Sequence, residues 1–226
     1  MTARVREGVF FEPPTPLPRG PHQLPREQVQ DAQRQRLMMA FTELLADRGY
    51  QAVRIIDIAK RAGVSNDAFY DVFANKEECA TAAHDHFAAV LERRAYRVDV
   101  APSRTWREFV LSSVGGYLET ITADPVVARA FHLELDGIGA TARQRRRAAL
   151  LHFAEAQMRE QERLCASDPL LKLQPLIIHL GSVHGVRQLA CDALEAESEP
   201  DFSVLIPDVV NWLVAAAYGK TMDGAD

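Results

Sequence analysis

Four neighbouring residues carry side chains of the kinds that recognise nucleic acid. The hydroxyl groups of Ser65 and Tyr70 can donate to phosphate oxygens, and the amide of Asn66 can bond base edges or phosphate. The methyl group of Ala68 could touch the methyl group of a thymine. A few residues later, the ammonium group of Lys76 could reach a backbone phosphate. The chemistry open to this segment is therefore hydrogen bonding and charge pairing with DNA.

The residues around these groups predict two short helices, over 55–62 and 66–73, that are joined by a tight turn. Ile58 and Ala59 begin an apolar stripe at helical spacing, and Gly63 ends the first helix because glycine tolerates a positive φ. Ser65 is a good N-cap for the second helix, whose inner face would hold Phe69. A second helix presented in this way is the usual device for placing side chains in the major groove.

This segment resembles the N-terminal domain of the tetracycline-repressor (TetR) family over residues 37–80. The resemblance rests on positions that fall in register: Gly49-Tyr50, Asp57-Ile58-Ala59, Ala62-Gly63-Val64-Ser65, Phe69-Tyr70, Phe73 and Lys76-Glu77. It implies a homodimer that binds a partly palindromic operator through each second helix, and a C-terminal domain that binds a ligand and dimerises. It also implies that Ser65, Asn66, Ala68 and Tyr70 contact DNA and that Arg54 meets a phosphate.

The second helix departs from the family at several positions. Asn66 stands where the family usually has Lys, and Asp67 stands where it usually has Gly. Asp67 and Asp71 place negative charge on the helix that should approach phosphates, although Asp67 could instead favour the helix N-terminus through the dipole. These residues leave a second hypothesis open, in which the chain is a helical small-molecule binding protein that has lost DNA binding.

Length and charge are compatible with a regulator of this kind. The 226 residues can form one large or two small domains, and the formal net charge is −5. Residues 1–100 hold 14 basic and 14 acidic residues, so the half that contains the candidate DNA contacts is neutral overall. The sequence has no long apolar run and no apolar signal core, so we expect a cytoplasmic protein.

We expect three parts along the chain. Residues 1–25 contain six of the 12 prolines and predict a flexible arm, which is either inert or a supplement to phosphate contact. Residues 26–98 would form the helix-turn-helix domain, with a first helix over 26–48 and a linking helix over 75–97. Residues 99–226 would form the effector-binding and dimerisation domain.

The C-terminal part predicts helices throughout, so the fold class is all-α. Asp124-Pro125 and Asp168-Pro169 are cap–proline signals, and the charge pattern predicts a helix over 140–165. A helix over 171–196 is expected to kink at Pro175, and the last helix is expected over 207–218.

Aromatic and other side chains of this part are the candidates for an effector pocket, since the resemblance implies that such helices surround one. The alternative for each is ordinary core packing. The candidates are Trp106, Phe109, Tyr117, Phe131, His132, Leu135, Phe153 and Met158.

A strip of small residues lies beside apolar ones between 176 and 186, and the last predicted helix carries a matching apolar face. Core packing within one chain explains part of this pattern. Pairing with a second copy in a four-helix bundle would explain the apolar residues that this core does not need. The candidates for the dimer interface are Leu176, Ile177, Leu180, His184, Val210, Leu213 and Val214.

No nucleophile–base pair, phosphate loop, metal motif or cofactor motif occurs in the sequence, so we expect neither an enzyme nor a bound cofactor. The three cysteines are far apart; they are either packed thiols or, less simply, a redox sensor. The hypothesis is a ligand-responsive regulator, in most such proteins a repressor, that binds a DNA operator as a dimer and releases it when a small molecule binds.

Overall fold

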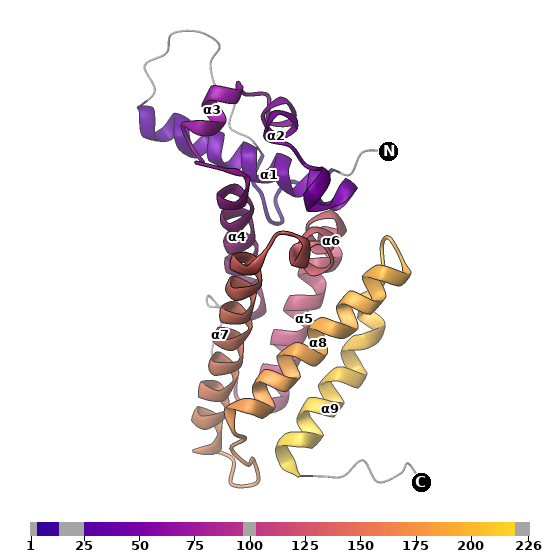
Figure 1. Cartoon of the computed structure of the whole chain (residues 1–226). Coiled ribbons are helices and arrows are strands. Elements are labelled where there is room, and N and C mark those ends of the chain that lie inside the picture. The colour runs from indigo at the N-terminus through magenta and orange to yellow at the C-terminus, as the bar shows by residue number, and fades with distance from the viewer. Residues whose placement is uncertain (1–3, 14–24, 97–102, 220–226) are drawn as a thin grey trace. The chain divides into compact units, whose positions relative to one another are not determined.

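The computed structural model describes residues 4–13, 25–96 and 103–219, and these residues form an all-α fold, as the sequence predicts (Figure 1). They divide into two compact units. The first comprises residues Met1–Ala88 and Ala123–Arg145, and the second comprises Ala89–Thr122 and Arg146–Asp226. This division differs from the predicted boundary at residue 98, because it passes through two long helices, α4 (Lys76–Tyr96) and α7 (Ala140–Cys165).

The first unit is built around α1 (Arg26–Ala52), which packs against α2 (Ile55–Ala62), α3 (Asn66–Tyr70) and α6 (Pro125–His132). Its inner side carries apolar residues at helical spacing that have no exposed surface, namely Leu37, Phe41 and Leu45. The helical conformation is interrupted at Gly49, where φ is 71°, one residue after the predicted end.

The turn between α2 and α3 has the geometry that its residues predict. Gly63 adopts φ 70° and ends α2 in the left-handed conformation. The Oγ atom of Ser65 accepts a hydrogen bond of 3.1 Å from the backbone N–H of Ala68, which caps α3. Helix α3 is shorter than predicted and ends at Tyr70, although Phe73 beyond it is still buried.

Residues 4–13 differ from the predicted flexible arm, because the structure folds them onto the first unit. Phe10 and Phe11 are 3% and 2% exposed, and Phe11 stacks on the ring of His86 at 5.0 Å. The backbone N–H of Val5 donates to Glu43, and that of Arg6 donates to Asp124. The rest of the predicted arm, residues 14–24 and 1–3, lies outside the described residues.

The second unit contains the end of α4, α5 (Trp106–Ala123) up to Thr122, most of α7, α8 (Leu176–Ala196) and α9 (Ile206–Tyr218). Gly116 allows α5 to approach α4 closely, since a Cβ there would lie 2.5 Å from the carbonyl oxygen of Arg94. In Figure 1, α8 and α9 run side by side. The two helices approach closely at Gly185, where a Cβ would lie 3.2 Å from the indole of Trp212.

The prediction for the start of α8 was wrong. The helix begins at Leu176 with Pro175 as its N-cap, so Pro175 starts the helix and does not kink it. Two short 3₁₀ segments, Leu135–Gly137 and Phe202–Leu205, precede α7 and α9. No described helix is both long enough and apolar enough to cross a membrane.

Candidate nucleic-acid interface and ligand pocket

Helix α3 presents the predicted DNA contacts on its solvent side. Asn66 is exposed, and Tyr70 is 53% exposed although it is a large aromatic residue. The opposite side of α3 is anchored by Phe69, which has no exposed surface and packs against Phe73. Ala68 is half-buried, so its methyl group is less available than the polar groups of Asn66 and Tyr70.

Two of the three remaining predicted DNA contacts, Ser65 and Arg54, have hydrogen-bond partners in the structure. The Oγ atom of Ser65 is an acceptor in the α3 cap, which leaves its hydroxyl hydrogen to donate to a phosphate. Arg54 precedes α2 and pairs with Asp57, with Nε 3.0 Å from Oδ2. Hydrogen bonding to Arg54 is the main cause that lowers the pKa of Asp57. The guanidinium of Arg54 is nevertheless 74% exposed, so it can reach solvent or a phosphate.

Lys76 has a role that the sequence did not indicate. Its Nζ atom donates to the carbonyl oxygens of Tyr50 and Val53, at 2.9 and 2.8 Å, and lies 3.9 Å from the centre of the Tyr50 ring. Partial burial lowers the pKa of this ammonium group. Two of its three N–H groups therefore hold the loop between α1 and α2, and one is left for a phosphate.

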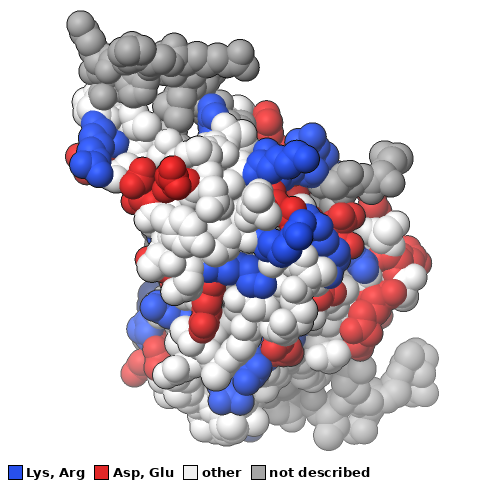
Figure 2. Space-filling model, turned by 45° about the horizontal axis from the view of Figure 1, so that its top comes forward, with Lys and Arg blue, Asp and Glu red and all other residues white. Residues whose placement is uncertain are grey.

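The two acidic residues at α3 are exposed. Asp67 lies in its first turn and Asp71 is its C-cap, and both lie on the surface, so neither is neutralised by burial. Figure 2 turns the top of the molecule forward, and over the described residues in view basic and acidic side chains are interspersed. Electrostatic attraction to DNA from this face is therefore local and modest.

Three of the predicted effector contacts lie in the first unit and form part of its core. Phe131 stacks on Phe87 of α4 at 4.9 Å, and His132 meets the same ring edge-on at 5.6 Å. The Nδ1 atom of His132 lies 3.0 Å from the carbonyl oxygen of Ala128, and Leu135 has no exposed surface. Phe131 and His132 thus both pack on Phe87, and Leu135 is buried, which is compatible with the core-packing alternative.

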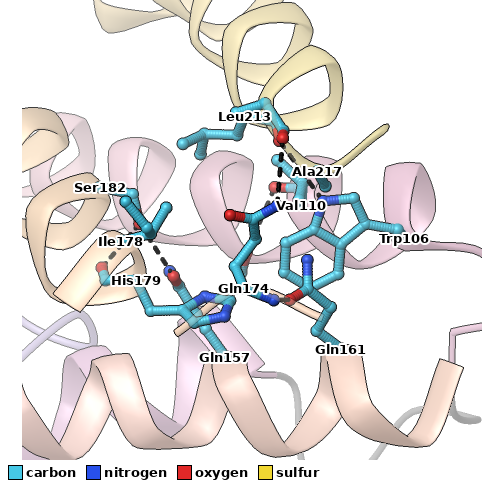
Figure 3. Close-up of a pocket in the computed structure, with 12 residues that line it drawn as sticks. Trp106, Val110, Gln157, Gln161, Gln174, Ile178, His179, Ser182, Leu213 and Ala217 are labelled. Carbon is cyan, nitrogen blue, oxygen red and sulfur yellow. Dashed lines mark hydrogen bonds between the residues drawn. The ribbon is translucent and has the colours of Figure 1, made fainter. Parts of the chain in front are cut away.

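A cavity of about 30 Å³ lies within the second unit, between α5, α7, α8 and α9 (Figure 3). Trp106 is the one predicted effector contact that lines it. Its Nε1 atom points to the carbonyl oxygen of Leu213 at 3.5 Å, and its ring meets that of His179 edge-on at 6.1 Å. The lining residues are Trp106, Val110, Ser113, Gln157, Gln161, Gln174, Ile178, His179, Ser182, Leu213, Ala216 and Ala217.

The other predicted effector contacts of this unit do not line the cavity. Phe109 stacks on Trp106 at 5.3 Å and so supports the cavity wall from behind. Tyr117, Phe153 and Met158 are half-buried elsewhere in the unit. Burial is the main cause that raises the pKa of the Tyr117 phenol.

The polar half of the cavity was missed, although a signal for it exists. Gln157 and Gln161 are four residues apart on α7, and they share a face with the buried residues Ala154 and Leu164. Amide side chains are mostly exposed in proteins, so two on the buried face of a helix indicate a polar site inside the fold.

The predicted dimer contacts fall into two groups. Leu176, Leu180, Leu213 and Val214 are half-buried, while His184 is exposed and Ile177 is 67% exposed. Val210 is 1% exposed because it packs inside its own unit. Val210 therefore offers little surface to a second copy and its place in an interface stays a prediction, whereas the other six leave apolar or aromatic surface on α8 and α9.

Comparison with known proteins agrees with this geometry. Residues 38–83 match the model of the bacterial regulatory proteins of the tetR family. Over 72 residues the chain is 39% identical to the HTH-type transcriptional activator FasR of Mycolicibacterium smegmatis, a match that spans 32% of this chain and 28% of that protein. The chain thus matches little more than a quarter of that curated relative.

Solved structures share the fold over most of the chain. The transcriptional regulator FadR from Bacillus subtilis, in complex with stearoyl-CoA, superposes with a TM-score of 0.71 at 20% identity and covers 80% of this chain and 97% of its own. The fatty acid degradation regulator FadR from Bacillus halodurans superposes with a TM-score of 0.68 at 18% identity and covers 80% and 94%.

The described residues thus combine a helix-turn-helix, the usual arrangement for placing a helix in the major groove, with a helical unit that contains a small cavity. Residues 38–83 therefore match the DNA-binding domain of the tetR family, and the fold of the chain is similar to that of solved transcriptional regulators.

Proposed function

We propose that the protein is a ligand-responsive repressor that binds a partly palindromic operator as a homodimer. The observation that carries this proposal is α3, a helix capped by Ser65 and anchored by Phe69 that leaves Asn66 and Tyr70 exposed. A helix held from one side, with hydrogen-bonding groups on the other, fits the major groove. One such helix per protomer would read one half-site.

The dimer would form through α8 and α9. Ile177 and Trp212 are 67% and 43% exposed, and exposed large apolar residues on adjacent helices support an interface. Half-sites one helical turn apart would then match the two-fold axis of the dimer.

We further propose that the effector is a fatty acyl thioester of coenzyme A. Two regulators of the same fold carry fatty-acid names, and one of them is in complex with stearoyl-CoA. The apolar wall of the cavity, with Val110, Ile178 and Leu213, suits the hydrocarbon part of such a ligand. Since the cavity measures about 30 Å³, a long acyl chain would enter only as the surrounding helices move apart.

Such a movement would link the ligand to DNA. Helices α4 and α7 each contribute residues to both units, so a shift in the second unit would be passed along them to the helix-turn-helix. A coupling free energy of about 1–3 kcal/mol would lower operator affinity roughly 5–150-fold.

The test is selection of bound sequences from a random DNA pool by the purified protein, followed by salt and palmitoyl-CoA titrations of the best sequence. The proposal expects an enriched palindrome, a steep salt dependence and release by the acyl-CoA. A bound acyl-CoA that leaves operator affinity unchanged would contradict the coupling, and tighter DNA binding would favour an activator.

A second candidate function is a helical small-molecule binding protein without DNA binding. The exposed carboxylates of Asp67 and Asp71 on α3 favour it, because they would face phosphates. Absence of any enriched sequence at low salt, with and without acyl-CoA, would support this function over the first.

A further inference from the structure

We propose that the cavity in the second unit holds an uncharged amide group of the effector, a site that rests on the ligand response proposed above. Its lining leaves one hydrogen-bond donor and one acceptor without partners, both on deeply buried side chains. An amide group supplies the matching acceptor and donor.

The unpartnered donor is the amide nitrogen of Gln161. This side chain of α7 has no exposed surface, and its Oε1 atom accepts a 2.7 Å hydrogen bond from the backbone N–H of Gln174. That bond fixes the orientation of the amide. Its Nε2 atom has no hydrogen-bond partner among the described residues. A buried amide donor without a partner costs free energy, which a ligand acceptor would recover.

The unpartnered acceptor is the Nε2 atom of His179. The ring is 3% exposed, and burial lowers its pKa, so it is neutral at pH 7. A hydrogen bond to the backbone of Gln174 opposes this lowering of the pKa. With that bond made by the Nδ1 proton, Nε2 carries a free lone pair, and it has no partner among the described residues.

The side chains of Ser182, Gln157 and Gln174 make hydrogen bonds within the wall. The hydroxyl of Ser182 lies 3.1 Å from Oε1 of Gln157 and 2.7 Å from the carbonyl oxygen of His179. The side-chain amide of Gln174 donates to the carbonyl oxygen of Ala216 at 3.3 Å. Figure 3 shows Gln161, Gln174 and His179 gathered at one side of the cavity.

The lining also excludes a charged group. None of the lining residues is an Asp, Glu, Lys or Arg, so a carboxylate or phosphate would be desolvated there without a counter-charge. A carboxylate, moreover, only accepts hydrogen bonds and would leave Nε2 of His179 unpaired. Acyl thioesters of coenzyme A carry secondary amides close to the thioester, so they fall within the class of ligand that this site selects.

The experiment uses the full chain with Trp212→Phe, which leaves Trp106 in the cavity wall as the one remaining tryptophan of two. Binding of N-methylhexanamide, methyl hexanoate and hexanoate is followed by Trp106 fluorescence at pH 7.5. We expect saturable binding of the amide and at least tenfold weaker binding of hexanoate. Methyl hexanoate, which lacks the N–H donor, should bind about fivefold more weakly than the amide.

Two variants test the named groups. Gln161→Met removes the amide donor and keeps a side chain of similar length, and His179→Phe removes the acceptor and keeps an aromatic ring beside Trp106. Each should weaken amide binding about tenfold, while Gln188→Met, the same change at an exposed position of α8, should leave it unaltered. Equal binding of N-methylhexanamide and hexanoate would overturn the proposed amide site. Folded variants that bind the amide as tightly as the parent would overturn it as well.

The site and the proposed function can fail separately. An amide that binds through Gln161 and His179 without changing operator affinity supports the site and contradicts the ligand response. An operator complex that palmitoyl-CoA dissociates, in a protein to which N-methylhexanamide does not bind, supports the ligand response and overturns the site.

Discussion

Lys76 at the start of α4 holds Tyr50 at the end of α1 in two ways at once. Its Nζ atom donates to the backbone carbonyl of Tyr50 at 2.9 Å and lies 3.9 Å from the centre of the same residue's ring. The second carbonyl that it holds belongs to Val53, in the short connection between α1 and α2. One side chain thus joins α4 to the end of α1 and to the connection that leads into α2.

Replacement of Lys76 by Met should therefore lower stability. Two carbonyl groups would lose a charged donor, so we expect the free energy of unfolding to fall by about 1–3 kcal/mol in urea titrations. Lys60→Met is the matched control, because Lys60 is exposed on α2. An unchanged stability combined with a salt slope reduced by about 0.9 would instead assign Lys76 to a phosphate.

Replacement of Arg54 by Ala should affect DNA binding and leave stability nearly unaltered. Arg54 is 74% exposed, and exposed ion pairs such as that with Asp57 contribute little to folding. We expect weaker operator binding and a log–log salt slope smaller by about 0.9, measured by fluorescence anisotropy. An identical slope in the variant would show that Arg54 does not contact a phosphate.

Phe10→Ala tests the packing of the N-terminal segment. Phe10 is 3% exposed and lies 5.2 Å from the ring of Phe87, so its truncation should cost about 3–5 kcal/mol in the free energy of unfolding. Glu12→Ala, at an exposed position of the same segment, should cost little. Equal stability of the two variants would contradict the packing of this segment and support the flexible arm that the prolines predict.

Acidification should destabilise the protein through His179. Burial lowers the pKa of His179 in the folded state, so the unfolded chain binds the proton more readily. The stabilising effect of the neutral ring is present above about pH 6.5, the ordinary pKa, and is lost as pH falls through the lower, folded pKa. Thermal unfolding between pH 8 and 5 should show a smaller loss in His179→Phe than in the parent. If the melting temperatures of the parent and of His179→Phe fell equally with pH, His179 would not be a source of the acid destabilisation.

A charge at Ile177 should weaken the dimer. Ile177→Glu would place a carboxylate on the proposed α8–α9 interface, and we expect a shift from dimer toward monomer in light scattering after size exclusion. Val204→Glu is the control, since Val204 has the same 67% exposure but lies outside α8 and α9. A dimer that persists in Ile177→Glu and dissociates in Val204→Glu would show that the interface lies at Val204 and not on α8 and α9.

The helix-turn-helix could be predicted because its determinants are local. Gly63 and Ser65 set the turn and the cap within three residues, and Phe69 marks the inner face of α3. The all-α fold follows equally from helical spacing and cap signals. The limits of α3 and α8 were less predictable, because they depend on how the chain packs beyond each cap.

The amide pair on α7 signals a polar site, but the cavity as a whole could not be predicted, because its lining residues come from several separate segments of the chain. Phe131 and Phe109 were predicted as ligand contacts because they are aromatic. In the structure Phe131 packs on Phe87, and Phe109 packs on Trp106. Whether an aromatic side chain faces a cavity or a neighbour depends on tertiary packing, which spacing along one helix does not contain.

The folded segment at residues 4–13 has a consequence for how this protein can diverge. Chain ends usually accumulate insertions and deletions freely. Here the backbone of Val5 and Arg6 is bonded to Glu43 and Asp124, and the next buried ring follows only four residues later, at Phe10. A single-residue deletion between Arg6 and Phe10 would break one of these attachments, so this stretch should conserve its length among close homologues while the residues before Val5 vary.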